Sequence, residues 1–384
     1  MVLDPCYSPE PPVPLTTTTT TTTTTTITIT VPTMAVTFDI TPEREASKLH
    51  FLYRQFFLAA PAVSPKEVDL TGKVAIVTGA TVGLGLETAR QLLDLNCQLI
   101  LAVRDVKRGE QARRNLLEGR SPPLPAEQIA VWPLDLASYE SIRAFAARTQ
   151  SLPHLDMAVL NAGVYKVDEQ FDPTTGYEEG VQINYLANVL LLVLLLPVLY
   201  AKRRGPQQPG RLVLVNSDTA AWSAFRERSA RPLLPAFQRP MQPAWNMQER
   251  YGVSKLLGQF FLVELAQRVP PSAVTVTSAN CGMCYGSAIG REGAGRVEGY
   301  AWAVISRILG RSCAVGARTF VHAAACFGQE VHGQYLEDAR LRPLAPIVYQ
   351  SEGLRIAKLL WEETMEELSF AGVREIVEEM AKLK

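Results

Sequence analysis

The stretch that most constrains the fold is TGKVAIVTGATVGLGLETARQLL, residues 71–93. Lys73–Thr78 is short, apolar and rich in β-branched residues, as buried strands are, and the apolar residues that follow recur at helical spacing. Between the two elements lie Gly79, Gly83 and Gly85. Because glycine has no Cβ, the chain can turn sharply there, and a phosphate can approach main-chain N–H groups at the positive end of the helix. The stretch therefore predicts a strand–turn–helix unit that could hold the pyrophosphate of a dinucleotide, although such turns also occur without a ligand.

Further apolar strand-like segments follow, and amphipathic helical segments separate several of them. The predicted strands are Cys97–Arg104, Gln128–Leu136, Asp156–Gly163, Arg211–Ser217, Ala273–Asn280 and a short His332–Asp338. Strands that alternate with helical crossovers pair in parallel, so the pattern predicts an α/β fold: a Rossmann-type, doubly wound parallel sheet of about seven strands. A single domain of this kind accounts for most of the 384 residues.

Two segments precede the predicted domain, which we assign to residues 66–384. Residues 1–41 are rich in proline and threonine, a composition that predicts a disordered tail. Residues 42–65 are expected to form an amphipathic helix and a linker, because Thr41 offers a cap and proline follows at the first helical position. The apolar side chains of this helix are Leu49, Leu52, Phe56 and Phe57. Packing on the domain's own surface is the favoured interpretation, with contact to a membrane surface or a substrate entrance as the alternatives.

Composition narrows the class of partner. The 38 basic and 38 acidic residues give a net charge of zero, so nothing points to nucleic acid. Most of the cysteines lie in apolar surroundings that suit reduced thiols. Cys281 and Cys284 form a CxxC that could serve metal or redox chemistry, but no second ligand pair accompanies it, and no metal site is predicted. No secretory or mitochondrial targeting pattern is present, which leads us to expect a cytoplasmic protein.

One apolar segment invites a membrane interpretation. Leu186–Tyr200 is shorter than the roughly 20 helical residues that a bilayer requires, and Pro197 interrupts it. We expect a buried core helix, which could also pair with a second subunit in a homodimer.

The predicted strand ends carry a common set of candidate residues. Ligands of open parallel sheets bind beyond the carboxyl ends of the strands. The glycine turn falls at that edge, and so do Arg104, Asp135, Asn161 and Ser217. These positions predict one crevice that several strands share.

A candidate proton donor lies downstream, in YGVSK at the start of a helical segment. Tyr251 and Lys255 are four residues apart and therefore lie on one helix face. An ammonium group near a tyrosine favours the phenolate and lowers the hydroxyl pKa, which makes the tyrosine a usable general acid or base. Ser217 could hydrogen-bond the same substrate oxygen. A lone tyrosine–lysine pair of this kind is usually structural, and only its place after a nucleotide turn and a serine-ending strand favours catalysis.

Taken together, these motifs resemble the short-chain dehydrogenase/reductase superfamily over about Lys66–Leu368. The motifs are TGATVGLG (78–85), LDL (134–136), NAG (161–163), Asn184, Ser217 and YGVSK (251–255). The segments VRDVKRGE and ERYGVSKLLGQFF are similar to the retinol-dehydrogenase-like and WW-domain-oxidoreductase-like branch, particularly its fungal members associated with secondary metabolism.

The resemblance implies a cofactor site. Gly79, Gly83 and Gly85 would hold the pyrophosphate, with backbone contacts from Thr81, Val82 and Leu84. Asp135 and Leu136 would meet the adenine, and Asn161, Ala162 and Gly163 would line the site. Asn280 and Gly282 match the segment that relatives place along the nicotinamide. Two departures, Cys281 for the usual proline and Gly286 with Ser287 for a threonine, put the geometry of this loop in doubt.

The resemblance also implies a catalytic tetrad of Asn184, Ser217, Tyr251 and Lys255. Tyr251 would exchange the proton with the carbonyl or alcohol oxygen, and Ser217 would position that oxygen. Lys255 would bind the nicotinamide ribose and lower the tyrosine pKa, and Asn184 would hold the water of a proton relay.

Cofactor choice depends on the end of the second predicted strand. An acid there would bind the ribose hydroxyls of NAD, whereas an arginine favours the extra phosphate of NADP. Arg104 occupies this position, followed by Lys107 and Arg108, so NADP is predicted over NAD despite the neighbouring Asp105. A solvated basic patch is the alternative.

The segment between Ser217 and Tyr251 is longer than in short members of the superfamily, and it holds Trp222, Phe225, Phe237 and Trp245. We expect these aromatics to form a lid over a large apolar substrate, with a satellite packing cluster as the alternative. Residues 283–297 are glycine-rich and predict a second, mobile part of the lid.

The sequence thus predicts an NADP-dependent oxidoreductase that interconverts a carbonyl and an alcohol on a small, largely apolar metabolite, in secondary-metabolite biosynthesis if the fungal resemblance holds. The alternative from another class is a non-catalytic dinucleotide-binding regulator or scaffold, which would commonly have lost the tetrad. Epimerisation or dehydration on the same fold is a further, weaker alternative.

Overall fold

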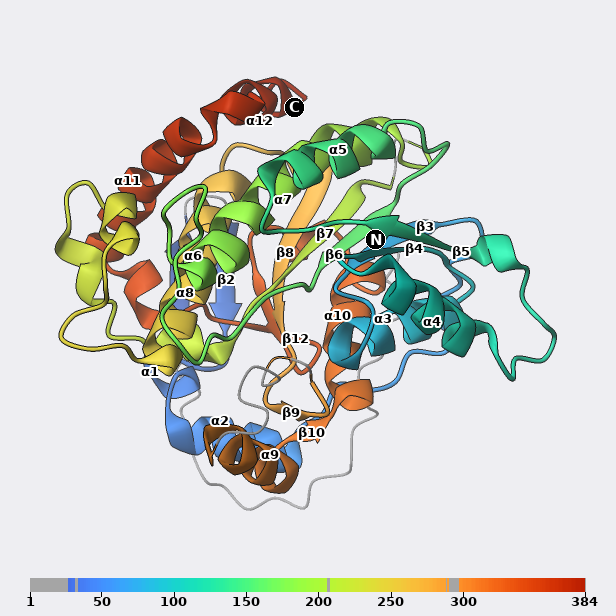
Figure 1. Ribbon diagram of the computed structural model, residues 1–384, viewed down its shortest axis with the longest axis horizontal. Coiled ribbons are helices and arrows are strands. Elements are labelled where there is room, and N and C mark those ends of the chain that lie inside the picture. Colours follow the sequence, from blue (N-terminus) through green and yellow to red (C-terminus); the bar gives the residue numbers. More distant parts are fainter. Residues whose placement is uncertain (1–26, 32–33, 206–207, 288, 290–296, 384) are drawn as a thin grey trace, which may run out of the picture.

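The computed structural model describes residues 27–31, 34–205, 208–287, 289 and 297–383. Among these residues the main sheet has eight strands in the order β12-β11-β8-β7-β6-β3-β4-β5 (Figure 1). The strands are β3 (Val74–Thr78), β4 (Gln98–Val103), β5 (Ile129–Pro133), β6 (Met157–Leu160), β7 (Gly210–Val215), β8 (Val274–Asn280), β11 (Tyr335–Glu337) and β12 (Arg340–Arg342).

Seven of these described strands pair in parallel, which confirms the predicted doubly wound sheet. The eighth, β12, turns back antiparallel to β11 at the sheet edge. Its turn residues Asp338 and Ala339 both have positive φ, +52° and +57°. Two-residue hairpin turns need that conformation but favour asparagine and glycine, so Asp-Ala gave no turn signal for this short strand.

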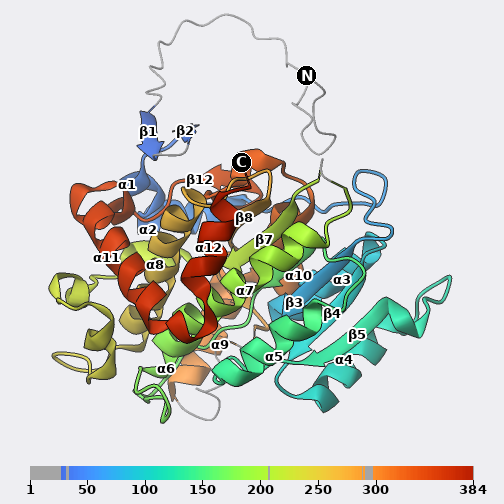
Figure 2. The same ribbon diagram turned by 90° about the horizontal axis from the view of Figure 1, so that it is seen from above.

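Helices cover both faces of the sheet (Figures 1 and 2). One face carries α3 (Gly83–Asp94), α4 (Val106–Leu117) and α10 (Cys313–Ala325), and the other carries α5 (Tyr139–Thr149), α7 (Asn188–Ala201) and α8 (Met247–Ala266). Successive strand residues enter opposite cores: Ile76 packs with the α7 side, and Ala75 and Val77 pack with the α3 side. The C-terminal helices α11 (Ser351–Glu367) and α12 (Val373–Ala381) lie outside α8 and α7.

Helix α7 is the apolar segment predicted to be a core helix, and the structure confirms this. The window Glu179–Ala201 is long and apolar enough to cross a membrane, but most of it is buried inside the protein. Helices α5 and α12 pack on α7, and Leu190–Leu192 are fully buried. Most of the apolar surface of α7 is therefore covered within the chain, and pairing with a second subunit stays a prediction.

The N-terminal tail contributes one described element outside the main sheet. Strands β1 (Ile27–Val31) and β2 (Met34–Phe38) pair antiparallel as an isolated ribbon. Such ribbons are marginally stable alone in water, which agrees with the low structural content that composition predicts for this tail. The rest of the predicted tail, residues 1–26 and 32–33, lies outside the described residues.

The predicted amphipathic helix is present as two pieces, α1 (Pro42–Glu45) and α2 (Lys48–Phe57), capped by Thr41 and Ser47. Its orientation differs from the favoured interpretation. Leu49 and Phe57 are 82% and 73% exposed, and Phe56 is also exposed, whereas the buried side chains are Phe51, Arg54 and Gln55. A partly polar face lies inward because it meets buried charges and main-chain groups.

Helix α2 lies beside α9 (Val297–Leu309), below the carboxyl ends of the strands in Figure 1. The short elements β9 (Cys284–Tyr285) and β10 (Arg311–Ser312) pair in parallel next to them. Residues of α2, α9 and β9 line the cavity at this end of the sheet, together with Trp222 from the segment between Ser217 and Tyr251.

Candidate active site

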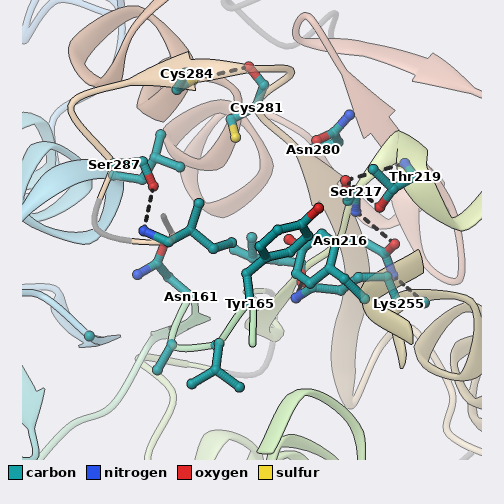
Figure 3. A pocket seen from close by; sticks show the side chains of 18 of the residues that line it. Asn161, Tyr165, Asn216, Ser217, Thr219, Lys255, Asn280, Cys281, Cys284 and Ser287 are labelled. Carbon is teal, nitrogen blue, oxygen red and sulfur yellow. Dashed lines mark hydrogen bonds between the residues drawn. The ribbon is translucent and has the colours of Figure 1, made fainter. Parts of the chain in front are cut away.

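A cavity of about 520 Å³ opens at the carboxyl ends of the strands. It brings together most of the residues predicted from the sequence. These are Gly79, Val82, Leu84, Arg104, Asp135, Leu136, Asn161, Ala162, Gly163, Ser217, Tyr251, Lys255, Asn280 and Gly282. Thr81, Gly83, Gly85 and Asn184 are not part of the lining. Figure 3 shows Ser217 and Thr219 on one side of the cavity and Asn161 toward the other.

The glycine turn has the geometry that a phosphate site requires. Gly79 and Gly83 have φ of +67° and +59°, a conformation that favours glycine. A Cβ on Gly85 would lie 2.5 Å from the Gly79 carbonyl oxygen, so this glycine permits close packing of turn on helix. Helix α3 begins at Gly83 without a side-chain cap, which leaves its first N–H groups available to an anion. The turn therefore fits a dinucleotide pyrophosphate.

The segment after β6 is fastened to the turn. Asn161 Nδ2 donates to the Thr78 carbonyl at 2.9 Å, and the Ala162 N–H donates to Thr78 Oγ1 at 2.8 Å. A Cβ on Gly163 would lie 2.8 Å from Asn184 Oδ1, so the chain passes close to the predicted tetrad asparagine. This segment thus joins two strand ends and the floor of the cavity.

Asn184 lies in a π-helical segment, Gln182–Ala187, a local widening that is frequent at functional sites. Its side chain is 4% exposed, accepts from the Val164 N–H at 2.8 Å and donates to Ser254 Oγ at 3.0 Å. It therefore stands behind the cavity wall and braces it. Its role in holding a water stays a prediction.

Tyr251 and Lys255 lie on one face of α8, as the spacing predicted. Burial raises the pKa of the Tyr251 hydroxyl, as do the nearby Cys281, Asp218 and Tyr165, while a hydrogen bond with Ser217 acts in the opposite direction. Burial lowers the pKa of Lys255 to about 8. The Tyr251 pKa thus moves opposite to the expected direction, because burial outweighs the favourable hydrogen bond. The hydroxyl is protonated at neutral pH.

Lys255 is held by the strand beside it. Its Nζ donates to the Val215 carbonyl at 2.9 Å and lies 5.7 Å from the centre of the Tyr251 ring. The Lys255 carbonyl accepts from Asn216 Nδ2 at 3.0 Å. These bonds fix α8 against the end of β7, where Ser217 follows.

Ser217 has two partners that sequence reasoning missed. Thr219 Oγ1 donates to Ser217 Oγ at 2.9 Å, and Ser217 Oγ donates to Asp218 Oδ1 at 3.3 Å. Burial raises the pKa of the Asp218 carboxyl, and the charge of Arg54 opposes that rise. Asp218 and Thr219 directly follow Ser217 in the sequence, and this position was the one feature from which their role could have been predicted.

Apolar and aromatic side chains also line the cavity, among them Phe51, Tyr165, Trp222, Met283, Ile289 and Ile305. The Tyr165 ring meets the Tyr251 ring edge-on, with centroids 4.9 Å apart. Trp222 meets Phe51 edge-on at 5.0 Å and donates from Nε1 to the Ala46 carbonyl at 2.8 Å. Phe51 and Tyr165 were missed because neither belongs to a motif.

The predicted aromatic lid is only partly correct. Trp222 lines the cavity, but Phe225 and Phe237 are buried in the hydrophobic core, where they pack with α8 and its neighbours. Trp245 donates to the Val167 carbonyl at 2.7 Å and does not line the cavity. The insert is therefore mainly a packing cluster that presents one tryptophan to the site. Of the second predicted lid part, Met283, Cys284, Ser287 and Ile289 line the cavity, and residues 288 and 290–296 lie outside the described residues.

Arg104 lies exposed at the end of β4, on the rim of the cavity. The neighbouring Asp105 is already engaged, because it caps α4 through the Arg108 N–H and pairs with the Arg108 side chain at 3.5 Å. Asp105 therefore has partners within α4, whereas Arg104 faces the cavity.

Cys281 and Cys284 both line the cavity, and like Cys97 and Cys313 they are buried thiols outside any disulfide. Burial raises the pKa values of Cys97 and Cys313. Within the described part of the chain, no group of three or more histidine, cysteine, aspartate or glutamate residues could hold a metal ion.

Comparison with known proteins identifies the family. A family model for short chain dehydrogenases matches residues 73–226. The chain is 57% identical over 91% of its length to the whole short-chain dehydrogenase fogG of Aspergillus ruber. It is 39% identical over 85% of its length to the short chain dehydrogenase/reductase mfmJ of Annulohypoxylon moriforme, of which 94% is covered.

Solved structures show the same fold. A short-chain dehydrogenase from Shigella flexneri complexed with NADP matches with a TM-score of 0.52 at 18% identity, covering 70% of this chain and 98% of that one. A second, from Escherichia coli complexed with NADPH, matches with a TM-score of 0.51 at 19% identity, covering 70% and 97%.

The chain therefore belongs to the short-chain dehydrogenase family. It is an oxidoreductase with fungal relatives, and its family binds a nicotinamide dinucleotide.

Proposed function

We propose that the protein uses NADPH to interconvert a carbonyl and an alcohol on a small, largely apolar metabolite. One observation carries the proposal: Ser217, Tyr251 and Lys255 lie where a glycine-lined nucleotide turn and an aromatic wall share one cavity. The bound nicotinamide supplies or accepts the hydride. The aromatic wall selects an apolar substrate and excludes water from the reacting carbon.

The roles of the polar residues follow from their contacts. Tyr251 is protonated at neutral pH because burial raises its pKa, so in reduction it donates the proton to the substrate oxygen. Ser217, which Thr219 already orients, directs the same oxygen toward Tyr251. Lys255 would hold the nicotinamide ribose, and Asn184 would support a water that returns the proton to Tyr251.

Preference for NADPH is the finer part of the proposal. Arg104 would bind the 2′-phosphate, since Asp105 is occupied by the cap of α4. The two structural neighbours with NADP or NADPH support this assignment by analogy. A role in secondary-metabolite biosynthesis rests on the fungal relatives, and cytoplasmic localisation stays a prediction.

The test measures the binding of NADPH and of NADH to the purified protein by the change in nicotinamide fluorescence. Arg104→Ala should raise the Kd for NADPH about 10- to 100-fold and leave NADH unchanged, as expected for loss of a charged hydrogen bond. Arg143→Ala, an exposed arginine on α5, is the matched control. Equal weakening for both cofactors would overturn the NADP assignment. A protein that binds cofactor but reduces no carbonyl in a broad aldehyde and ketone screen would instead be a dinucleotide-binding regulator.

A further inference from the structure

Helix α2 carries two buried polar side chains that no sequence motif explains. Arg54 is 2% exposed and Gln55 is 8% exposed, and both extend into the region where the catalytic serine and the segment after β8 meet. We propose that α2 is a positioning element of the active site and acts through Arg54 and Gln55. The inference rests on the function proposed above and assigns to the N-terminal segment a part in the reaction.

Gln55 holds the loop that follows β8. Its Oε1 accepts from the Met283 N–H at 3.0 Å, and its Nε2 donates to the Met283 carbonyl at 3.0 Å. The second proton of the same amide goes to the Leu309 carbonyl, at 2.9 Å, at the end of α9. One side chain thus ties together two segments that both contribute lining residues to the cavity.

The neighbouring residue shows how closely the loop is held. A Cβ on Gly282 would lie 2.3 Å from Gln55 Oε1, and Gly282 has φ of +68°. Gly282 and Met283 both line the cavity directly after Asn280 and Cys281. Gln55 therefore fixes the position of the Gly282–Met283 main chain beside the part of the cavity that would bind the nicotinamide.

Arg54 holds two other groups from behind. Its guanidinium lies 3.7 Å from Asp218 Oδ2, and the other oxygen of that carboxylate accepts from Ser217 Oγ. It also pairs closely with Glu337, which accepts from Asn280 Nδ2 at 2.6 Å. Arg54 thus contacts Ser217 indirectly, through Asp218, and it contacts Asn280 indirectly, through Glu337.

The surrounding charges show why a cation is needed at this place. Glu45, Asp218, Glu337 and Asp338 are all carboxylates within 4 Å of the Arg54 guanidinium. Burial raises the pKa of Asp218 and of Glu337, and Arg54 is the largest influence that opposes it for both. Without Arg54 these carboxyl groups would have to bind protons or move apart, and either change would disturb the hydrogen bonds of Ser217 and Asn280.

The first experiment compares Gln55→Glu and Gln55→Ala with the wild type. Glutamate keeps the shape but has no donor, and its carboxylate would face two carbonyl oxygens. We expect both variants to raise the Kd for NADPH about 10- to 100-fold, as misplacement of a bound group can, with glutamate no better than alanine. The melting temperature should also fall by a few degrees, because buried main-chain groups lose their partners. Gln91→Glu is the matched control, because the amide of this half-buried residue on α3 also donates to a backbone carbonyl, at a place that does not line the cavity. A tolerated Gln55→Glu would show that Gln55 only fills space.

The second experiment tests the charge of Arg54. Arg54→Met should lower kcat about 10- to 100-fold, and adding Asp218→Asn, which can still accept from Ser217, should restore most of the loss. If Arg54→Met does not fold, Arg54→Lys keeps the charge and should keep kcat within a few-fold of the wild type. A loss as large as that expected for Arg54→Met would then overturn the role of the charge. A double variant no more active than the single one would overturn the role of Arg54.

The two proposals fail in different ways. A wild-type protein that binds no NADPH and reduces no carbonyl removes the proposed function and this inference with it. A wild type that does both, beside Gln55 and Arg54 variants with unchanged Kd, kcat and KM, removes only the inference.

Discussion

The cavity has two walls that are built in different ways. The nucleotide wall consists of the ends of β3, β4 and β6 with the glycine turn, and the parallel sheet itself places these residues side by side. The substrate wall consists of α2, Trp222 and the described residues from Met283 to Ile305. Bonds between side chains and main chain hold it, between residues as far apart as Gln55 and Leu309.

The two walls differ in how their residues are held in place, and we expect cofactor binding and substrate selectivity to depend on different walls. A residue at a strand end keeps its place as long as the sheet forms, so the nucleotide wall is set by topology. A residue of the substrate wall keeps its place only while a few specific partners remain. Substitutions in the first wall should therefore change chemistry or cofactor binding. Substitutions in the second should change substrate binding and local stability, and those that release the segment after β8, which Gln55 holds, should weaken cofactor binding as well.

The largest effect is expected where the two walls meet. Tyr251→Phe removes the proton donor and should lower kcat about 10³-fold or more, while the Kd for NADPH stays within a few-fold, because the ring still packs against Tyr165. Steady-state reduction of an apolar aldehyde, with fluorescence titration of NADPH, measures both. Tyr53→Phe, on the exposed face of α2, is the control. Turnover above a tenth of the wild-type rate would contradict the assignment of Tyr251.

Burial of the charged Lys255 side chain, where the two walls meet, should lower the free energy of unfolding. Its folded pKa of about 8 lies below its ordinary value of 10.5, so between these pH values the unfolded chain binds more protons and stability rises with pH. The cost below pH 8 is about 3 kcal/mol. Losing the bond to Val215 in Lys255→Met removes about 1 kcal/mol, so the inactive variant should be about 2 kcal/mol more stable than the cofactor-free wild type at pH 7.

The pH dependence of this difference is the sharper measurement. Urea unfolding of both proteins from pH 7 to pH 10.5 should show the advantage of Lys255→Met shrinking and then reversing. A constant difference across this range would mean that Lys255 titrates near its ordinary pKa in the folded protein.

The substrate wall should respond with a smaller and different change. Trp222→Ala removes the indole contact with Phe51 and the bond to the Ala46 carbonyl, so the entrance formed by α2 should loosen. We expect KM for an apolar carbonyl to rise about 10-fold with the Kd for NADPH unchanged. Trp245→Ala is the matched control, because that indole makes a similar bond, to Val167, away from the cavity. Equal effects of the two variants on KM would contradict the assignment of Trp222 to substrate binding.

The same distinction explains what the sequence could predict. The glycine turn, Asn161, Ser217 and the Tyr251–Lys255 pair each follow a recognisable strand or begin a helix, so local pattern and sheet topology were enough to bring them together. Seven of the eight described strands of the main sheet were found for the same reason. The eighth, β12, was missed because its turn carries no glycine or asparagine, and the short pairs β1–β2 and β9–β10 were not predicted either.

The substrate wall had no such pattern. The spacing of α2 correctly predicted a helix, but the inward face was assigned to the wrong side chains. Arg54 and Gln55 are polar, and most of their buried partners lie more than 160 residues away. Phe225 and Phe237 resembled lid residues by position and proved to be core. Tertiary contacts decided both cases, and a single sequence does not record them.

The smallest expected effect separates two roles that coincide at the nucleotide wall. Asp105 follows Arg104 at the end of β4, where an acid could in principle select NAD, yet its carboxylate caps α4. Asp105→Asn keeps a good cap without the charge, so it should leave both the NADPH to NADH preference and the free energy of unfolding nearly unchanged. Asp105→Ala should lower the free energy of unfolding by about 1 kcal/mol at the same preference. Urea unfolding and paired cofactor titrations measure these changes, and a shift of preference toward NADPH in Asp105→Asn would show that the carboxylate takes part in cofactor choice after all.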